Sequence, residues 1–216
     1  MNKQERKIIK SLNKIGVDTR FISLYDDNIY INNLKFSKFS HKKEDDFHQL
    51  YPHIKIVRSK LFQKICIKVS RTIKNQIKPK EIIYINPNQT DVNILLYILL
   101  EPYQRKYGIQ ITDELTEECI QVSSKTLNDF AEEYINLMIG GLLISNTYEE
   151  KTIYPLMHVS NQLIIDWINS TDIEYTKSIT KKQTTSTQII EFLNKHIPNV
   201  QESIVQSVKY LDENNI

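Results

Sequence analysis

Glycine is scarce in this sequence. Its 216 residues contain only four glycines, Gly16, Gly108, Gly140 and Gly141, where average usage of about 7% would give about fifteen. Glycine lets backbone amides approach a phosphate closely, so the shortage speaks against a glycine-rich phosphate loop. Cysteine is scarce too, since Cys66 and Cys119 are the only two. Two separate cysteines make neither a zinc knuckle nor a disulfide framework. We therefore expect no metal site, no cofactor and a reducing compartment.

Long apolar runs are also missing. The longest, Ile94 to Leu100, is far shorter than the roughly 20 residues of a membrane span. The first sixteen residues are charged and contain no apolar signal core. The sequence therefore predicts a cytoplasmic protein with no membrane partner.

Acidic residues are rare in the first 80 positions. Residues 1–80 hold 19 of the 28 Lys and Arg but 7 of the 26 Asp and Glu, a net charge of +12, which leaves −10 for residues 81–216. Such an uneven distribution predicts that the N-terminal half faces a polyanion, either tRNA or rRNA. The acidic half would suit a basic protein, such as a ribosomal protein.

One helix predicted over residues 59–78 has two different faces. Apolar side chains at helical spacing, including Phe62, Ile65 and Val69, form one face. The opposite face contains cations and no acid: Lys60, Lys64, Lys68, Arg71, Lys74 and Lys78. A cation at each turn can contact successive phosphates, and such contacts dominate nucleic-acid affinity. A purely solubilising face normally mixes both signs of charge, so we interpret this row as the RNA-binding site.

Before this helix, residues 1–57 are predicted to form a basic N-terminal appendage. Residues 3–15 have the spacing of a helix, and residues 21–24 and 29–36 are predicted strands of a hairpin. Residues 37–55 are expected to be a solvated loop. His41, His48 and His53 lie there, but their spacing matches no metal-ligand pattern.

After residue 57, short apolar strands alternate with helices. Strands are predicted at 81–86, 109–111, 119–122, 142–145, 152–154 and 173–175, and helices at 92–100, 126–139, 159–169, 184–195 and 199–211. This alternation is typical of an α/β fold with an open parallel sheet and helices on both faces. Residues 58–216 are therefore predicted to form one α/β domain.

The stretch from Lys80 to Leu100 resembles the opening of the N-type ATP pyrophosphatases, or PP-loop proteins. In that family a strand leads into a Ser-Gly-Gly-x-Asp-Ser loop and a buried helix. The corresponding residues here are Pro87, Asn88, Gln89, Thr90, Asp91 and Val92. Only Asp91 is kept. Asn88 and Gln89 add side chains where a phosphate would approach the backbone, and Pro87 removes an amide donor.

Further segments resemble the same family in the same order. Residues 126–141 are similar to its His-Asn-Ala-Asp-Asp-x-x-Glu-Thr helix, without the leading histidine. Residues 152–159 resemble the following Arg-Pro-Leu segment, with Tyr154 in place of the arginine. Residues 189–211 resemble the end of the non-catalytic second subunit of cytosolic tRNA thiouridylase. Only about 35 residues separate the loop from Asn128, so the sheet is expected to be trimmed, and the zinc-binding Cys-x-x-Cys pairs are missing.

The resemblance implies a degenerate PP-loop domain that binds RNA and is not an enzyme. Its partner would be tRNA together with a catalytic thiouridylase subunit. One alternative is a dormancy, or hibernation, factor that occupies a tRNA site on the ribosome. A second is a divergent ATP-dependent tRNA-modifying enzyme in which Asp91, Asp129 and Glu132 hold Mg²⁺. A third is a module that binds only proteins.

Overall fold

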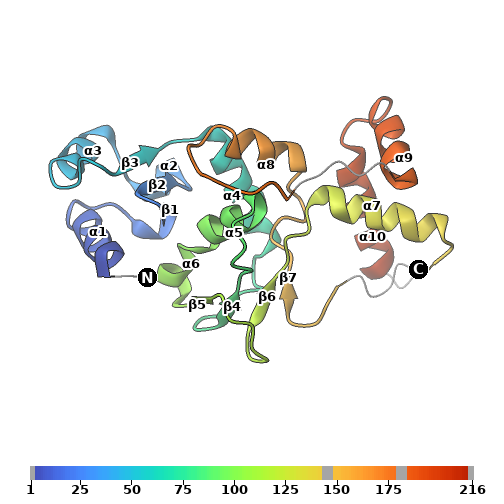
Figure 1. Ribbon diagram of the computed structural model, residues 1–216, viewed down its shortest axis with the longest axis horizontal. Helices are drawn as coiled ribbons and strands as arrows, with labels where there is room; N and C mark the ends of the chain where they lie inside the picture. The colour runs from blue at the N-terminus through green and yellow to red at the C-terminus, as the bar shows by residue number, and fades with distance from the viewer. Residues whose placement is uncertain (1–2, 143–147, 179–183, 214–216) are drawn as a thin grey trace.

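A computed structural model of the chain describes residues 3–142, 148–178 and 184–213. Two β-sheets lie side by side along an elongated molecule, and a group of helices lies at the far end (Figure 1). The α/β class predicted from the sequence is confirmed, with a parallel sheet flanked by helices. Within the described residues, no helix has the length and apolar character needed to cross a bilayer.

The N-terminal part contains a three-stranded sheet in the order β1-β2-β3. Its elements are α1 (Lys3–Lys14), η1 (Thr19–Phe21), β1 (Ile22–Tyr25), β2 (Asn28–Ile31), α2 (Leu34–Ser37), α3 (His41–His48) and β3 (Lys55–Val57). The predicted hairpin is present, but its second strand, predicted over 29–36, ends at Ile31 and is followed by helix α2. Asp26 and Asp27 have φ of 45° and 53°, the left-handed conformation that a tight two-residue hairpin turn requires.

The segment predicted as a solvated loop contains a helix. Ser40 caps α3, because its hydroxyl accepts a hydrogen bond from the amide of Lys43. Phe47 is the buried side chain of this helix and stacks on Tyr51 at 5.0 Å between ring centroids. A single apolar contact with the core produces no periodic pattern in the sequence, so the helix was missed.

The second sheet is fully parallel, with strand order β5-β4-β6-β7. Its strands are β4 (Ile82–Tyr84), β5 (Gln110–Thr112), β6 (Ile120–Val122) and β7 (Thr152–Ile153). Its main helices are α4 (Lys60–Thr72), α5 (Asp91–Leu100) and α8 (Asn161–Ile168), and the short α6 (Tyr103–Tyr107) precedes β5. Phe62 of α4 stacks on Trp167 of α8 at 5.4 Å within the core. Because all four strands are parallel, the sheet has one carboxyl edge and one amino edge.

Residues 173–175 form no strand; instead Thr176 makes a single bridge to Thr90, beside the start of α5. Most of the strand predicted at 142–145 lies outside the described residues. The helix predicted over 59–78 ends at Thr72, because the chain turns at Asn75, which has φ of 68°.

The chain ends in helices α7 (Leu127–Ile139), α9 (Thr185–Asn194) and α10 (Val200–Glu213). They pack against one another at the end of the molecule opposite the N-terminal sheet (Figure 1). Thr126 caps α7 in a capping box with Asp129.

A buried ion pair joins the N-terminal sheet to the parallel sheet. Glu101 at the end of α5 accepts a hydrogen bond from the amide of Leu24 at 3.1 Å. Arg105 of α6 pairs with Glu101 and donates to the carbonyls of Thr19 and Ile22 at 2.8 and 2.6 Å. The guanidinium thus fixes β1 against α5.

Candidate functional site

The loop that follows β4 is held by its own polar side chains. The amide of Asn88 donates to the Asn86 side chain at 3.0 Å, and the Asn93 side chain donates to the Asn88 carbonyl at 3.1 Å. Thr90, not Asp91, is the cap of α5, since its hydroxyl accepts from the amide of Asn93. None of residues 87–92 has a positive φ, so the backbone of this loop does not require glycine.

Asp91 does not project into open space. Its side chain is buried, and its carboxylate accepts hydrogen bonds from the amide and hydroxyl of Ser178. The amide of Asp91 donates to the Thr176 carbonyl at 3.2 Å, and the Thr176 amide donates to the Gln89 carbonyl at 2.8 Å. The segment around Thr176 therefore covers the first turn of α5. In the described part of the chain, the Gln89 amide has no hydrogen-bond partner.

The three acids suggested as a magnesium site are not brought together. Asp129 accepts from the amide and hydroxyl of Thr126 at the start of α7, and Glu132 lies one turn further along that helix. Among the described residues, no three His, Cys, Asp or Glu side chains are arranged to hold a metal ion. Asp91 and Asp129 have structural roles here, which is why their carboxylates point away from a shared centre.

A cavity of about 310 Å³ opens at the carboxyl edge of the parallel sheet, between the ends of β4 and β5. Open α/β sheets bind ligands at this edge. Its lining comes from the end of β4 and the loop after it, from α5, from the end of β5 and from the tip of the hairpin: Ile85, Asn86, Pro87, Asn88, Gln89, Asn93, Ile94, Tyr97, Ile111, Thr112, Asp113 and Tyr25. Of the six loop residues matched to the nucleotide loop, Pro87, Asn88 and Gln89 line the cavity. The other three, Thr90, Asp91 and Val92, do not line it.

Nine of the twelve lining residues were not identified from the sequence, among them Tyr25, Tyr97 and Asp113. Tyr25 and Tyr97 meet edge to face at 5.9 Å between ring centroids. Burial raises the pKa of both phenols, that of Tyr97 to about 12, so both stay neutral donors at physiological pH. Asp113 carries the single formal charge of the lining. Its position directly after strand β5 is the signal that would have found Asp113, whereas Tyr25 comes from another sheet.

The cationic row of α4 is present and accessible. Lys60, Lys64 and Arg71 are exposed on the helix, and Lys74 and Lys78 are exposed in the turn that follows it. Lys68 is the exception, because its ammonium lies 3.7 Å from the carboxylate of Glu202 on α10. The inward face is as predicted, with Phe62, Ile65 and Val69 buried.

No family model matches this sequence. A protein of Methanocaldococcus jannaschii described as a probable sulfurtransferase is 31% identical to it over 93 residues. The matched part is 42% of this chain and 27% of that protein, so the chain spans about a quarter of its relative. The structure is similar to that of the U34-tRNA thiolase NcsA from Methanococcus maripaludis with its [4Fe-4S] cluster. That similarity has a TM-score of 0.56 at 16% identity and covers 77% of this chain and 84% of the thiolase chain.

These comparisons correct the prediction that the chain is not an enzyme, since both proteins are described by an enzymatic activity. The prediction relied on missing glycines, and the geometry shows why that reasoning failed. Residues 87–92 keep an ordinary backbone without glycine, and a cavity still opens beside them. Neither comparison points to a non-catalytic second subunit or to a ribosomal dormancy factor.

The residues of this chain do not fit an iron–sulfur cluster. Such clusters are typically held by four cysteine thiolates, and this sequence has two cysteines. Cys119 is buried, and its sulfur lies 3.0 Å from the Thr116 hydroxyl. Burial raises the pKa of the Cys66 thiol, which keeps it protonated and a poor ligand.

Proposed function

We propose that this chain is a divergent ATP-dependent enzyme of tRNA modification. It would bind the nucleoside part of ATP in the cavity at the carboxyl edge and RNA along the cationic face of α4. The observation that carries the proposal is the cavity itself, bounded by the loop after β4 and by two neutral tyrosine rings. The thiolase-like fold supports it.

The cavity has groups suited to each part of a nucleoside. Tyr25 and Tyr97 offer aromatic surface for a purine base, with Ile94 and Ile111 as apolar walls. Asp113 would accept from a ribose hydroxyl, as carboxylates do at the strand ends of other nucleotide-binding sheets. The Gln89 amide, beside the start of α5, is the backbone donor left for a phosphate oxygen.

The reaction proposed is adenylation of an RNA base. A carbonyl oxygen of the base attacks the α-phosphorus of ATP, the bond to the bridging oxygen of the β-phosphate breaks, and pyrophosphate leaves. The oxygen then carries AMP and is ready for displacement by sulfur. We assign no sulfur-transfer step to this chain, because neither of its cysteines lines the cavity.

Titration calorimetry with ATP and Mg²⁺ tests the nucleotide site. Ile111→Trp places an indole in the cavity and should reduce ATP affinity by at least about tenfold, or 1.4 kcal/mol. Leu115→Trp is the matched control, because Leu115 is exposed a few residues away and outside the lining. Release of pyrophosphate from ATP should require tRNA. A wild-type chain that binds no ATP at about 1 mM would refute the proposal.

A further inference from the structure

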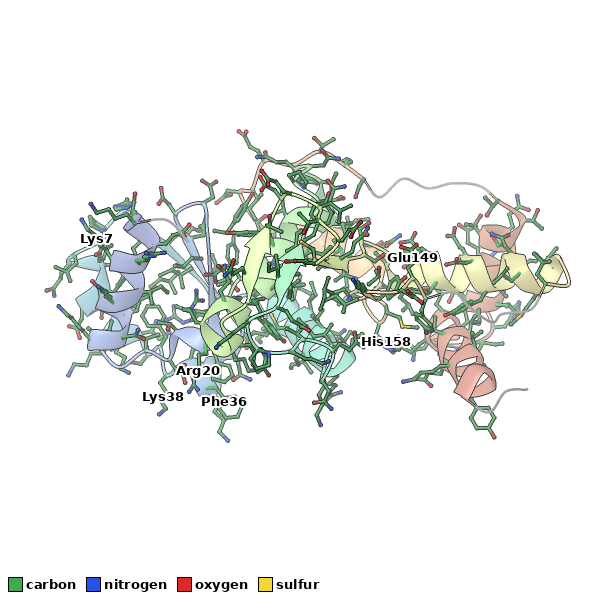
Figure 2. All side chains as sticks on the ribbon, turned by 90° about the horizontal axis from the view of Figure 1, so that it is seen from below. Lys7, Arg20, Phe36, Lys38, Glu149 and His158 are labelled. Atoms are coloured by element: carbon green, nitrogen blue, oxygen red, sulfur yellow. The ribbon has the colours of Figure 1, made fainter. Side chains whose placement is uncertain are left out.

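A second and larger hollow lies at the amino edge of the parallel sheet. This basic groove, of about 1230 Å³, runs between α4 and α10 past the starts of β4, β6 and β7. It is therefore separated from the nucleotide cavity by the length of the strands, about 10 Å for three residues. His158, which lines it, lies between the parallel sheet and the C-terminal helices (Figure 2).

The walls of the groove carry cations from separate parts of the chain. Two come from α4, two from the turn before β4, one from the turn before β7 and one from α10: Lys68, Arg71, Lys78, Lys80, Lys151 and Lys209. The acids in the lining are Glu81, Glu118 and Glu202. Glu81 is turned to the backbone, because its carboxylate accepts from the amide of Lys78 at 2.6 Å. Lys68, Arg71 and Lys78 of the cationic row therefore form part of the wall of a wider concave surface. The other members of that row do not line the groove.

Two of these lysines adopt an unfavourable backbone conformation. Lys80 has φ of 68° and Lys151 has φ of 53°, each in the turn before a strand. The left-handed region is unfavourable for a residue with a side chain, and glycine or asparagine is the usual choice there. Backbone strain that is kept at a surface points to a use for the side chain. Here both side chains line the same groove.

Glu202 already places an anion in the groove. Its carboxylate lies 3.7 Å from the ammonium of Lys68 and 3.2 Å from Nδ1 of His158. The contact with His158 lacks hydrogen-bond geometry, and this buried nitrogen has no hydrogen-bond partner in the described structure. The protein therefore fills only part of the hydrogen-bonding capacity of the Lys68 ammonium and of His158 Nδ1 in the wall of the groove.

We propose that the basic groove binds the phosphodiester backbone of RNA and that Glu202 occupies the position of one phosphate until RNA displaces it. The choice of RNA rests on the proposed function. The shape supports it as well, since a concave surface with cations on several walls encloses a chain better than it meets a flat membrane.

Fluorescence anisotropy with a labelled tRNA transcript tests the groove. Lys80→Gly and Lys151→Gly each remove a groove cation and relieve the strained backbone, so RNA affinity should fall several-fold while the unfolding midpoint stays the same or rises. Lys38→Gly is the matched control. Lys38 also has a positive φ, of 54°, but lies on the N-terminal part, away from His158 (Figure 2). Equal effects of all three substitutions would overturn the proposal.

Glu202→Gln should have the opposite effect and raise RNA affinity several-fold, because it frees Lys68 and His158 for phosphate. Glu191→Gln, at an exposed position of α9, removes the same charge as a control. No gain with Glu202→Gln would contradict the displacement, and equally tight binding of polyglutamate or anionic vesicles would contradict RNA as the ligand. ATP titration of the same variants separates the RNA groove from the proposed ATP cavity. Either proposal can fail while the other holds.

Discussion

The two edges of the parallel sheet differ in charge, size and origin. The cavity at the carboxyl edge is small, contains one charged side chain and is completed by Tyr25 from the N-terminal hairpin. The groove at the amino edge is about four times larger and contains nine charged side chains other than histidine. Ligands that are recognised by shape and stacking suit the first edge, and a polyanion suits the second. The predictions below test whether the two edges act independently.

The largest effect is expected from the buried pair that holds the hairpin in place. Arg105→Met leaves Glu101 buried without its partner, which should cost about 3–5 kcal/mol of unfolding free energy. Because Glu101 also binds the Leu24 amide, one residue before Tyr25, ATP affinity should fall as well. Urea denaturation and ATP calorimetry measure the two effects.

Arg20→Met provides the control for this experiment. Arg20 pairs with Asp18 on the exposed surface of the N-terminal part, where ion pairs contribute little to stability. If Arg105→Met lowered RNA affinity as much as ATP affinity, the separation of the two edges would be wrong.

A smaller effect is expected in the salt dependence of binding. Each phosphate contact with a single strand adds about −0.7 to the slope of log affinity against log salt. Lys78→Gln should therefore make the slope for RNA less steep by about 0.7, while the affinity for ATP should not change. Lys195→Gln is the matched control, because Lys195 is exposed at the end of α9 and lies neither on α4 nor in the groove. An unchanged RNA slope in Lys78→Gln would place the RNA elsewhere.

Local features of the fold could be predicted where one signal decides the structure. The hairpin follows from alternating apolar residues around Asp26 and Asp27, and the start of α7 follows from the capping residue Thr126. The inward face of α4 follows from helical spacing. The polar helix α3 could not be predicted, because its one core contact, Phe47, produces no periodicity.

The sites were harder to predict than the fold, because they combine distant segments. Asn88 and Gln89 were correctly assigned to a loop after β4, but Tyr25 joins them only through the packing of the hairpin on α5. Likewise the row on α4 could be predicted from helical spacing. Lys151 and Lys209 lie along the same groove only because β7 pairs with β6 in the parallel sheet and α10 approaches α4. The amount of glycine was a poor guide, because the loop after β4 has no positive φ.

The smallest expected effect concerns the tyrosines of the nucleotide cavity at high pH. Burial raises the pKa of Tyr97 to about 12, from about 10 in the unfolded chain. A phenol with a raised pKa contributes stability that is complete below the unfolded pKa and is lost as the pH rises through the folded pKa. Wild-type stability should therefore fall between about pH 10 and 12.

Tyr97→Phe should make that fall less steep, and Tyr210→Phe should not, because Tyr210 is exposed on α10. Thermal unfolding across this pH range measures the difference, and absorbance of the tyrosinate ion follows the titration itself. ATP bound in the cavity would shield Tyr97 further from water and delay its ionisation, whereas RNA bound at the amino edge would leave it unchanged. A delay caused by RNA alone would show that the two edges communicate through the sheet.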